Sequence, residues 1–563
     1  MVTFIGGPGS GKTATGRHIA LLFERLGWEV IPVYNEDEIV RYGNGNIRQV
    51  FLLDDVLGSF ALDLSRLNNI VSCKKTILNS INNRSKIVFT CRKTVYNEAI
   101  GLKPFVLKHI VDLESKTNDL NELEKIQILT NHCLKAGIDK KLYINLSLTS
   151  AKIMFPFLCQ LFAANVKYQM FGSDFFERPF DYLLEEMSKL QKTNTAQYVS
   201  LVLCLVNNRK LSKENLPFKN VKKRIYNSCG LDRGTADRKI IDALSHIEGT
   251  YVVLIESEYS FIHDSIYEAI AFHYGQVFPE QILEYMPSDF ISSKVIVFGN
   301  SSFDELSIKI TEKYFSNLAE RIYSDLESNQ LFDVFMNKAL KYEPFLDVFI
   351  QLMKKKPYND FKKTFLGHKF SFFGDCDHLI NTQEKDKDHE EEAGSTYYDE
   401  TFKRALLTDK REGEFEDKNL RYNIHRILVI SWVVYFGHIR LLQEIVRHVH
   451  DHNESTDLVF GSSTEEQARL LVLSVYNGDP GLIETILKYV KKKSINSTSM
   501  YMDDDFLEAN HHRTLSPLTA ACQFNNFKIV ELLVRAGADV NLADFDYEFP
   551  ILMLHQRMDI MKS

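Results

Sequence analysis

The sequence predicts a multidomain protein of class α/β plus α, in which a parallel-sheet domain precedes helical domains and helical repeats. Three observations support this prediction. A glycine-rich loop, GGPGSGKT, follows the apolar, β-branched run VTFI at residues 2–5. Two more apolar runs, QVFLL and KIVFTC, end in charged residues. Near the C-terminus Pro517 and Pro550 lie 33 residues apart, which is the period of a known helical repeat.

Composition and charge narrow the class of protein. A chain of 563 residues with 45% hydrophobic and 25% charged residues is typical of several globular domains. A net charge of -8 argues against a general nucleic-acid binder. Apolar runs such as ILVISWVVYF are too short to span a bilayer, and no signal peptide is apparent. The eight cysteines are scattered without a CxxC pair, so we expect reduced thiols and a cytoplasmic, intracellular location.

The glycine-rich loop fits the P-loop pattern G-x-x-x-x-G-K-[ST]. Backbone N–H groups of such a loop surround phosphate oxygens at the N-terminus of a helix. Lys12 would contact the β- and γ-phosphates, and Thr13 would offer its hydroxyl to Mg²⁺. We therefore expect ATP or ADP with Mg²⁺ as the ligands. The predicted nucleotide-binding residues of the loop are Gly6, Gly7, Pro8, Gly9, Ser10, Gly11, Lys12, Thr13 and Ala14.

A helix is expected directly after the loop. Ile19, Leu22, Phe23 and Leu26 fall at i, i+3, i+4 and i+7, the apolar spacing of an amphipathic helix. Gly27 can end this helix in a left-handed conformation.

The next two strands end in residues that suit nucleotide chemistry. Asp54 and Asp55 follow QVFLL, at the strand end where ligands collect in doubly wound sheets. Asp54 would hold Mg²⁺ together with Thr13, and Asp55 would orient or deprotonate an attacking water. Arg92 follows KIVFTC and could sense the γ-phosphate as a planar cation. Asp55 and Arg92 are the candidate catalytic residues.

These motifs, in the order GGPGSGKTATGRHIALLF, VFLLDDVLG and SKIVFTCR, resemble the STAND class of P-loop NTPases, the switch ATPases related to NACHT and NB-ARC proteins. They are most similar to the novel STAND NTPase 3 family, and the resemblance extends over about residues 1–275. MFPFLCQLF resembles the segment that sets a proline against adenine, which implies a nucleotide contact by Pro156. FIHDSIYEAIAFHYG resembles the histidine–aspartate motif of a winged-helix domain. It implies that His263 reaches the β-phosphate of ADP, and Asp264 would cap the following helix.

The C-terminal pattern resembles an ankyrin repeat. The stretch LSPLTAACQFNNFKIVELLVRAGADVNLAD has the turn, two helices and glycine of that unit, and degenerate earlier units surround Gly437 and Gly478. Such repeats stack on their neighbours and bind protein partners. His448, His450 and His452 alternate at a helix end, which we interpret as solvated rather than as a metal site.

The expected domains follow from these boundaries. The sequence starts on a predicted strand at residue 2 and stops inside an unfinished repeat. We therefore expect a fragment or a chain lacking a preceding effector domain. The domains are a P-loop NTPase core at 1–115, a helical domain at 116–195, a winged-helix-like domain at 196–275, a helical region at 276–415 with a charged disordered loop near 383–396, and ankyrin repeats at 416–563.

Three functions are compatible with the sequence. The first is a signalling switch, with innate-immune or stress signalling as a candidate role. In it ADP holds the domains closed, exchange for ATP opens them, and opened subunits form a homo-oligomer. Hydrolysis would be slow, because no arginine finger can be assigned. The second is an ankyrin scaffold with a structural nucleotide that is never turned over. The third and weakest is a nucleotide or small-molecule kinase, since no lid or acceptor signature is seen.

Overall fold

The computed structural model divides into two compact units. Unit 1 comprises Met1–Ala61, Asn79–Asn97 and Leu107–Tyr314, and unit 2 comprises Leu62–Leu78, Glu98–Val106 and Phe315–Ser563. The structure describes residues 1–44, 46–58, 62–63, 66–67, 70, 84–101, 109–149, 151, 154–212, 216–217, 219–298, 306–366, 368–370, 426–497, 499–501, 513–524 and 526–542. The charged loop expected near 383–396, Pro550 and the end of the last repeat lie outside these residues.

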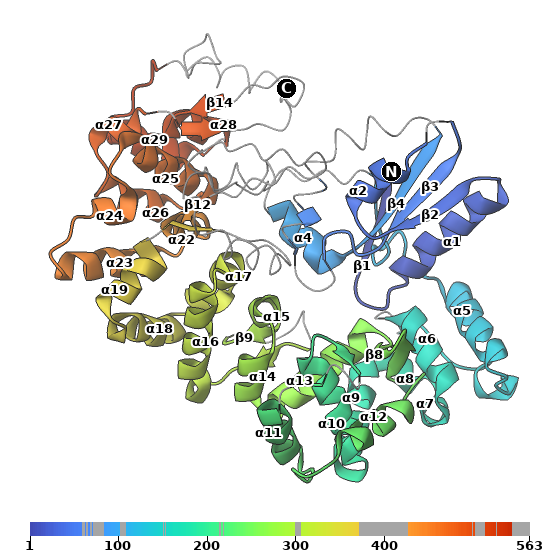
Figure 1. Ribbon diagram of the computed structural model, residues 1–563. Helices are drawn as coiled ribbons and strands as arrows, with labels where there is room; N and C mark the ends of the chain where they lie inside the picture. Colours follow the sequence, from blue (N-terminus) through green and yellow to red (C-terminus); the bar gives the residue numbers. More distant parts are fainter. Residues whose placement is uncertain are drawn as a thin grey trace. The chain divides into compact units, whose positions relative to one another are not determined.

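Unit 1 begins with a five-stranded sheet in the order β2-β3-β4-β1-β5, and every neighbouring pair is parallel (Figure 1). This sheet confirms the predicted α/β class. Its strands are β1 (Val2–Gly6), β2 (Glu29–Val33), β3 (Gln49–Leu53), β4 (Ser85–Arg92) and β5 (Ile110–Asp112). Gly6 pairs with Arg92, so the P-loop and Arg92 leave the sheet at the same edge. The acidic pair follows β3 at this edge, because parallel strands share one carboxyl end.

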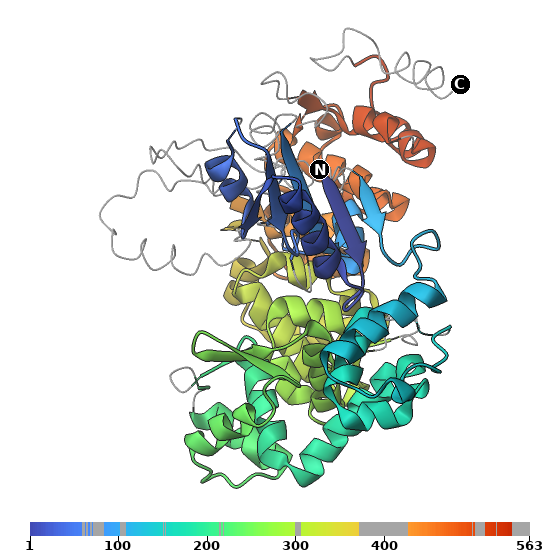
Figure 2. The same cartoon turned by 90° about the vertical axis from the view of Figure 1, so that its right-hand side faces the viewer.

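Helix α1 (Lys12–Arg25) lies against one face of this sheet (Figure 2). Its closest approach is at Gly16, where an added Cβ would lie 3.1 Å from Leu52 Cδ1. Ala20 is buried in the same core, and Ile19 and Phe23 pack partly buried against it. Gly27 adopts the predicted left-handed conformation, with φ 79°.

The apolar spacing of α1 is only partly buried. Leu22 is 43% exposed and Leu26 is 68% exposed. With 3.6 residues per turn both leucines lie well around the helix axis from Gly16 and Ala20, which make the close contact with the sheet. The apolar spacing therefore identified the helix but not its whole buried face.

The remainder of unit 1 is mainly helical, with one small antiparallel sheet in the order β6-β8-β7. Strands β7 and β8 pair antiparallel as a hairpin, with Val252 opposite Phe261. This hairpin leads into α13, whose first turn reaches the nucleotide-site residues described below. The elements are α2 (Glu36–Tyr42), α4 (Lys93–Gly101), α5 (Glu122–Lys135), η1 (Lys140–Leu142), α6 (Phe155–Ala164), α7 (Val166–Phe171), α8 (Asp174–Glu177), α9 (Pro179–Thr193), α10 (Thr195–Val206), β6 (Lys210–Leu211), α11 (Lys219–Cys229), α12 (Asp237–Ser245), β7 (Val252–Ile255), β8 (Glu258–Phe261), α13 (Asp264–Val277), α14 (Pro279–Tyr285), α15 (Ser288–Lys294), β9 (Val295–Ile296), β10 (Ile308–Lys309) and η2 (Glu312–Tyr314).

Unit 2 is helical in the part of the chain that the structure describes, with two short strand pairs. Its elements are α16 (Phe315–Glu327), α17 (Leu331–Met336), η3 (Lys338–Lys341), α18 (Glu343–Lys355), α19 (Tyr358–Phe361), η4 (Lys362–Leu366), β11 (His368–Phe370), β12 (Arg426–Leu428), α22 (Val429–Tyr435), α23 (Ile439–Asp451), α24 (Asp457–Phe460), α25 (Thr464–Asn477), α26 (Pro480–Leu487), α27 (Lys492–Ile495), β13 (Ser499–Tyr501), β14 (Arg513–Leu515), α28 (Pro517–Gln523) and α29 (Phe527–Arg535).

Three helix pairs of unit 2 stack in sequence order. Helix α25 packs against both α22 and α28, and α26 packs against both α23 and α29 (Figure 1). Gly437 and Gly478 have φ 72° and 82°, the left-handed turns between helices. The Asn477 amide donates to Tyr435 O at 2.9 Å, and the Asn526 amide donates to Gly478 O at 3.4 Å. Each helix pair is thus hydrogen-bonded, through an asparagine side chain, to the end of the first helix of the pair before it or to the turn that follows that helix.

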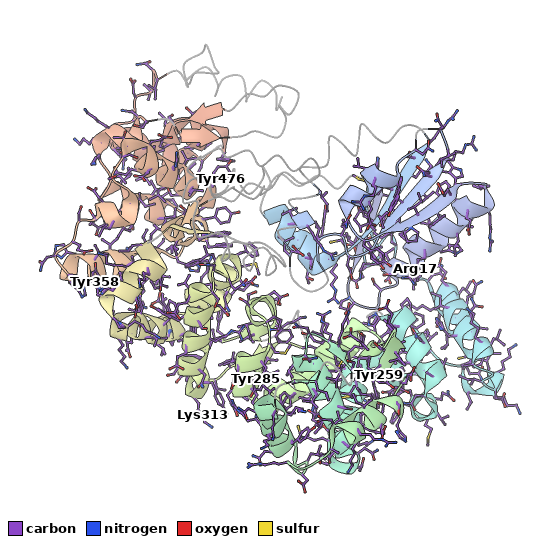
Figure 3. The ribbon with its side chains drawn as sticks, in the orientation of Figure 1. Arg17, Tyr259, Tyr285, Lys313, Tyr358 and Tyr476 are labelled. Carbon is purple, nitrogen blue, oxygen red and sulfur yellow. The ribbon has the colours of Figure 1, made fainter. Side chains whose placement is uncertain are left out.

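The histidines at the end of α23 are solvated only in part. His450 and His452 are exposed, as expected, but His448 is 7% exposed and its ring meets Phe361 edge-on, with centroids 4.7 Å apart. His452 also stacks on Tyr358, labelled in Figure 3, with centroids 3.7 Å apart. The prediction is wrong for His448 because α19 covers it, which no local pattern reveals.

Two further observations concern metals and membranes. Among the residues described, no three His, Cys, Asp or Glu side chains gather as a metal site. No helix in the same residues is both long and apolar enough to cross a membrane. The cysteines that the structure describes are free thiols.

Candidate functional site

The P-loop curves tightly and the N-terminus of α6 lies directly against it. Gly9 and Gly11 have φ 69° and 91°, a conformation that glycine adopts without strain. A Cβ at Gly9 would lie 2.9 Å from Met154 Cβ, so no larger residue fits there. A Cβ at Gly11 would lie 3.4 Å from Pro156 Cγ. The structure therefore brings Pro156 to the loop, and the adenine contact that the resemblance implies stays a prediction.

Lys12 lies inside the loop rather than in solvent. Its side chain is 7% exposed, and Nζ donates to Gly7 O at 2.7 Å. Burial lowers the pKa of Lys12, which the nearby carboxylate of Asp55 partly opposes. A buried cation with one carbonyl partner is well placed to receive an anion.

Asp54 is held by two hydroxyl groups. Thr13 Oγ1 donates to Asp54 Oδ1 at 2.9 Å, and Thr90 Oγ1 donates to the same oxygen. The Asp55 amide in turn donates to Thr90 Oγ1 at 2.9 Å. Thr90, which is fully buried on β4, was missed by the sequence reasoning. Its signal was a polar residue inside an otherwise apolar strand.

Asp55 is a carboxylate held in an unfavourable environment. Its backbone has φ 46°, in the left-handed region that non-glycine residues rarely adopt. Burial raises the pKa of Asp55 to about 6, although the Arg92 and Lys12 cations pull it down. A carboxylate with a pKa close to neutral is a better proton acceptor than an ordinary one.

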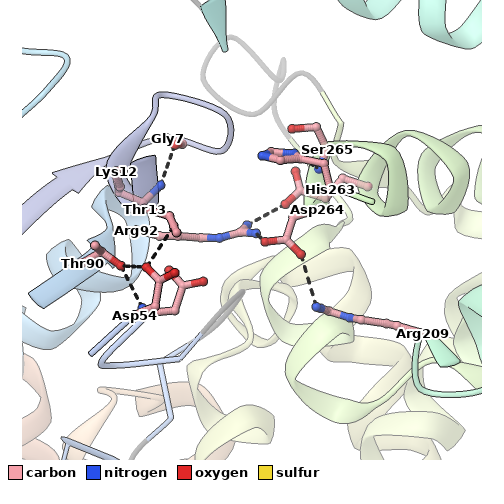
Figure 4. A network of polar contacts seen from close by, with 12 residues as sticks. Gly7, Lys12, Thr13, Asp54, Thr90, Arg92, Arg209, His263, Asp264 and Ser265 are labelled. Atoms are coloured by element: carbon pink, nitrogen blue, oxygen red, sulfur yellow. Dashed lines mark hydrogen bonds and ion pairs between the residues drawn. The ribbon is translucent and has the colours of Figure 1, made fainter. Parts of the chain in front are cut away.

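Arg92 does not point freely into the site but contacts α13. Its Nη1 donates to Glu268 Oε1 at 2.8 Å, and its Nη2 donates to Asp264 Oδ2. Arg92 is 4% exposed and the Glu268 side chain 6%, so the Arg92–Glu268 pair is shielded from water. Figure 4 shows the guanidinium extending from the sheet toward Asp264, with Arg209 on the other side of that carboxylate. Arg209 Nη1 lies 3.5 Å from Asp264 Oδ1.

His263, and not Asp264, caps α13, which corrects the sequence prediction. His263 Nδ1 accepts a hydrogen bond from the Ser265 amide at 3.1 Å. Asp264 instead lies in the first turn, where its carboxylate pairs with the two arginines. The ion pairs draw the Asp264 side chain away from the helix end, so the preceding residue takes the cap.

The cap also determines the state of the His263 ring. Burial lowers the pKa of His263 to about 4, so the imidazole is neutral at pH 7. Because an amide N–H can only donate, Nδ1 must be the unprotonated nitrogen and Nε2 must carry the hydrogen. The ring stacks on Phe157 with centroids 3.9 Å apart, which restricts its orientation. His263 is therefore a neutral, oriented N–H donor.

The residues present fit a nucleotide phosphate with a divalent cation. Ser10 Oγ is buried and has no hydrogen-bond partner in the described part of the chain. Lys12 supplies a buried positive charge, and Thr13 with Asp54 supplies two adjacent hard oxygen ligands of the kind Mg²⁺ prefers. The predicted loop, acidic pair, arginine and histidine thus converge, while Thr90, Arg209 and Glu268 are additions from the structure.

Comparison with known proteins agrees with this geometry. The family model Novel STAND NTPase 3 matches residues 1–135, which contain the P-loop, the acidic pair and Arg92. The match ends before Pro156 and His263. No curated protein matches the chain. The predicted resemblance is confirmed: residues 1–135 match the novel STAND NTPases, and residues 515–545 match the ankyrin repeat.

Proposed function

We propose that this chain is a nucleotide-controlled signalling switch. In this proposal the STAND-like site binds ATP or ADP with Mg²⁺, and the nucleotide decides between a closed and an open, self-associating form. The ankyrin-like stack binds a protein partner inside the cell. The family match at residues 1–135 and the repeat at 515–545 support nucleotide-binding signalling with protein interaction.

The residues of the candidate site have distinct roles in this proposal. Lys12 and the P-loop amides bind the phosphates, and Thr13 and Asp54 hold the metal ion. When bound, the nucleotide and Mg²⁺ supply the reactive phosphoanhydride and the countercharge for hydrolysis. Asp55 orients the attacking water and accepts its proton, for which its raised pKa is suited. Turnover is slow, since Arg92 is paired with carboxylates in this form.

We propose that residues 196–275 form a winged-helix-like domain and that this domain stabilises the closed form. The β6-β8-β7 sheet leading into α13 supports it. The neutral His263 donates its Nε2–H to the β-phosphate of ADP, while Pro156 contacts the adenine. A contact made only in the closed form biases the equilibrium by its full free energy.

The protein-binding end is proposed to be an ankyrin solenoid over residues 416–563. The stacked pairs of α22 with α23, α25 with α26, and α28 with α29 support it. Stacked repeats of this kind present a continuous surface to a partner.

The observation that best supports the proposal is the position of Arg92. It leaves β4 beside the P-loop, lies near enough to Lys12 and Asp55 to lower the pKa of each, and pairs with Asp264 and Glu268 of α13. Arg92 thus links the nucleotide site to a helix that begins 172 positions later in the sequence. Through this link the bound nucleotide could change how the domains are arranged.

Binding and light scattering of two variants test the switch. Lys12→Ala removes a charge-assisted phosphate contact and should weaken ADP and ATP alike, by roughly tenfold to more than a hundredfold. His263→Ala should weaken ADP by about tenfold to a hundredfold, weaken ATP less, and raise self-association in ADP. His246→Ala, an exposed histidine of the same unit, is the matched control.

Two results would contradict the proposal. Unchanged nucleotide affinity in Lys12→Ala would refute the binding site. Unchanged ADP-to-ATP affinity ratio and unchanged mass in His263→Ala would instead favour the scaffold with a structural nucleotide, since its ligand makes equal contacts in every form.

A further inference from the structure

Glu268 is a buried carboxylate whose two oxygens contact different cations. It lies one turn after Asp264 on α13 and is 6% exposed. Oε1 accepts from Arg92 Nη1 at 2.8 Å, and Oε2 lies 3.4 Å from Lys294 Nζ. Glu268 lies outside the histidine–aspartate pair that the sequence singled out.

The two carboxylates that contact Arg92 differ in exposure to water. The Asp264 side chain is 35% exposed and is also paired with Arg209, whereas the Glu268 side chain is 6% exposed. Water screens the first pair more than the second. Glu268 is therefore the hold on the guanidinium that water screens less.

Lys294 reaches this pair from a later part of unit 1. It is the last residue of α15, and β9 follows it directly and pairs with β10. Strand β10 in turn packs on α13, where a Cβ at Gly275 would lie 2.6 Å from Ile308 Cδ1. Close packing of β10 on α13 thus supports the region that presents Lys294 to Glu268.

We propose that Glu268 is a positioning residue that holds Arg92 away from the γ-phosphate of ATP, and that Lys294 sets the strength of this hold. This inference rests on the proposed nucleotide function. A γ-phosphate must compete with Glu268 for the Arg92 guanidinium, whereas ADP has no γ-phosphate and leaves the pair intact. The contact therefore favours ADP, because only ATP must break it.

Lys294 acts in the opposite direction to Glu268. Its ammonium group shares the carboxylate with Arg92, so it reduces the negative charge that Arg92 experiences. Removing Lys294 leaves Glu268 more fully available to Arg92 and should tighten the hold. A purely structural role for both residues would instead make both substitutions act alike.

The test is the ratio of ATP to ADP affinity in the full chain, measured by titration calorimetry with Mg²⁺. Glu268→Gln keeps the side-chain shape and should raise the ratio by about tenfold. Lys294→Met should lower it by a few-fold, and the double variant should match Glu268→Gln, because Lys294 acts through Glu268. Glu284→Gln breaks the exposed pair with Arg224, 2.6 Å long, and should leave the ratio unchanged.

The outcomes separate this inference from the function on which it rests. Shifts of Glu268→Gln and Lys294→Met in the same direction, or no shift in either, would overturn the Arg92 hold. If His263→Ala shifts the ratio in the same assay while the Glu268 and Lys294 variants do not, only the hold is refuted. If the wild-type chain binds neither nucleotide, both proposals are refuted. Should Glu268→Gln fail to fold, Lys294→Met alone still decides the sign, since a ratio unchanged or raised in that variant contradicts the hold.

Discussion

Replacing Asp55 by Asn should stabilise unit 1 and, if the proposed function holds, remove hydrolysis. Burial places the pKa of Asp55 at about 6, against an ordinary value of 3.8. That difference corresponds to a cost of up to about 3 kcal/mol for keeping the carboxylate ionised in the folded protein. Asn has nearly the same shape and carries no charge, so it removes this cost. Sites built for chemistry commonly sacrifice stability in this way.

The effect should depend on pH with a definite sign. The folded pKa of Asp55 lies above its unfolded value, so the folded state binds the proton more tightly. The cost is fully present above about pH 6, shrinks as the pH falls toward the unfolded value, and vanishes below it. Asp55→Asn should therefore exceed the wild type in stability at about pH 8 and match it at about pH 4.

Thermal unfolding of the full chain without nucleotide measures this difference. The relevant transition is the one that added ADP shifts upward, because a ligand stabilises only the unit that binds it. For a unit of this size about 3 kcal/mol corresponds to a rise of roughly 5–10 °C. An equal shift at both pH values, or a lower transition temperature at about pH 8, would refute the reasoning. Single-turnover hydrolysis by the wild type should also fall as the pH drops through about 6.

Two other predictions concern the loop and the helical stack. Gly9→Ala should destabilise unit 1 by about 2–3 kcal/mol and weaken nucleotide binding. The added Cβ would clash with Met154, and alanine would have to adopt a positive φ. Denaturation measures the loss of stability, and calorimetry measures the loss of binding. Gly27→Ala, with φ 79° and nothing within 4 Å, should cost only about 1 kcal/mol, and an equal loss in both variants would exclude the close approach as the cause. Asn477→Ala should destabilise unit 2 by about 1 kcal/mol, because it removes a hydrogen bond of 2.9 Å. Asn526→Ala should cost less, because its hydrogen bond is 3.4 Å long. Urea unfolding measures both, and the reverse order of the two losses would contradict the stacking role.

Much of the N-terminal domain could be predicted because its signals are local. Apolar β-branched runs identify buried parallel strands, and the spacing of glycine, lysine and threonine in the P-loop is read within eight residues. Parallel pairing then brings the ends of β1, β3 and β4 to one edge. The meeting of Lys12, Asp54 and Arg92 follows from topology alone.

Local patterns were less reliable where the neighbour was unknown. The apolar spacing of α1 identified the helix, but Leu22 and Leu26 are exposed because the sheet contacts the side of Gly16 and Ala20. The end of α23 was expected in solvent, and His450 and His452 are exposed, but α19 covers His448. In both cases periodicity described the helix, while burial depended on an element elsewhere in the chain.

The sequence by itself determined the chemistry of the phosphate loop, because the required residue types are contiguous and their backbone conformations are local. Only the tertiary structure decided which groups hold Arg92, since Asp264 and Glu268 lie 172 and 176 positions away in the sequence. It also decided that His263 is neutral with its hydrogen on Nε2, because burial and the hydrogen bond from the Ser265 amide exist only in the folded chain. The physical reason is common to both: ion pairs and pKa values depend on distance and on exclusion of water, and neither is encoded in the spacing of residues along the chain.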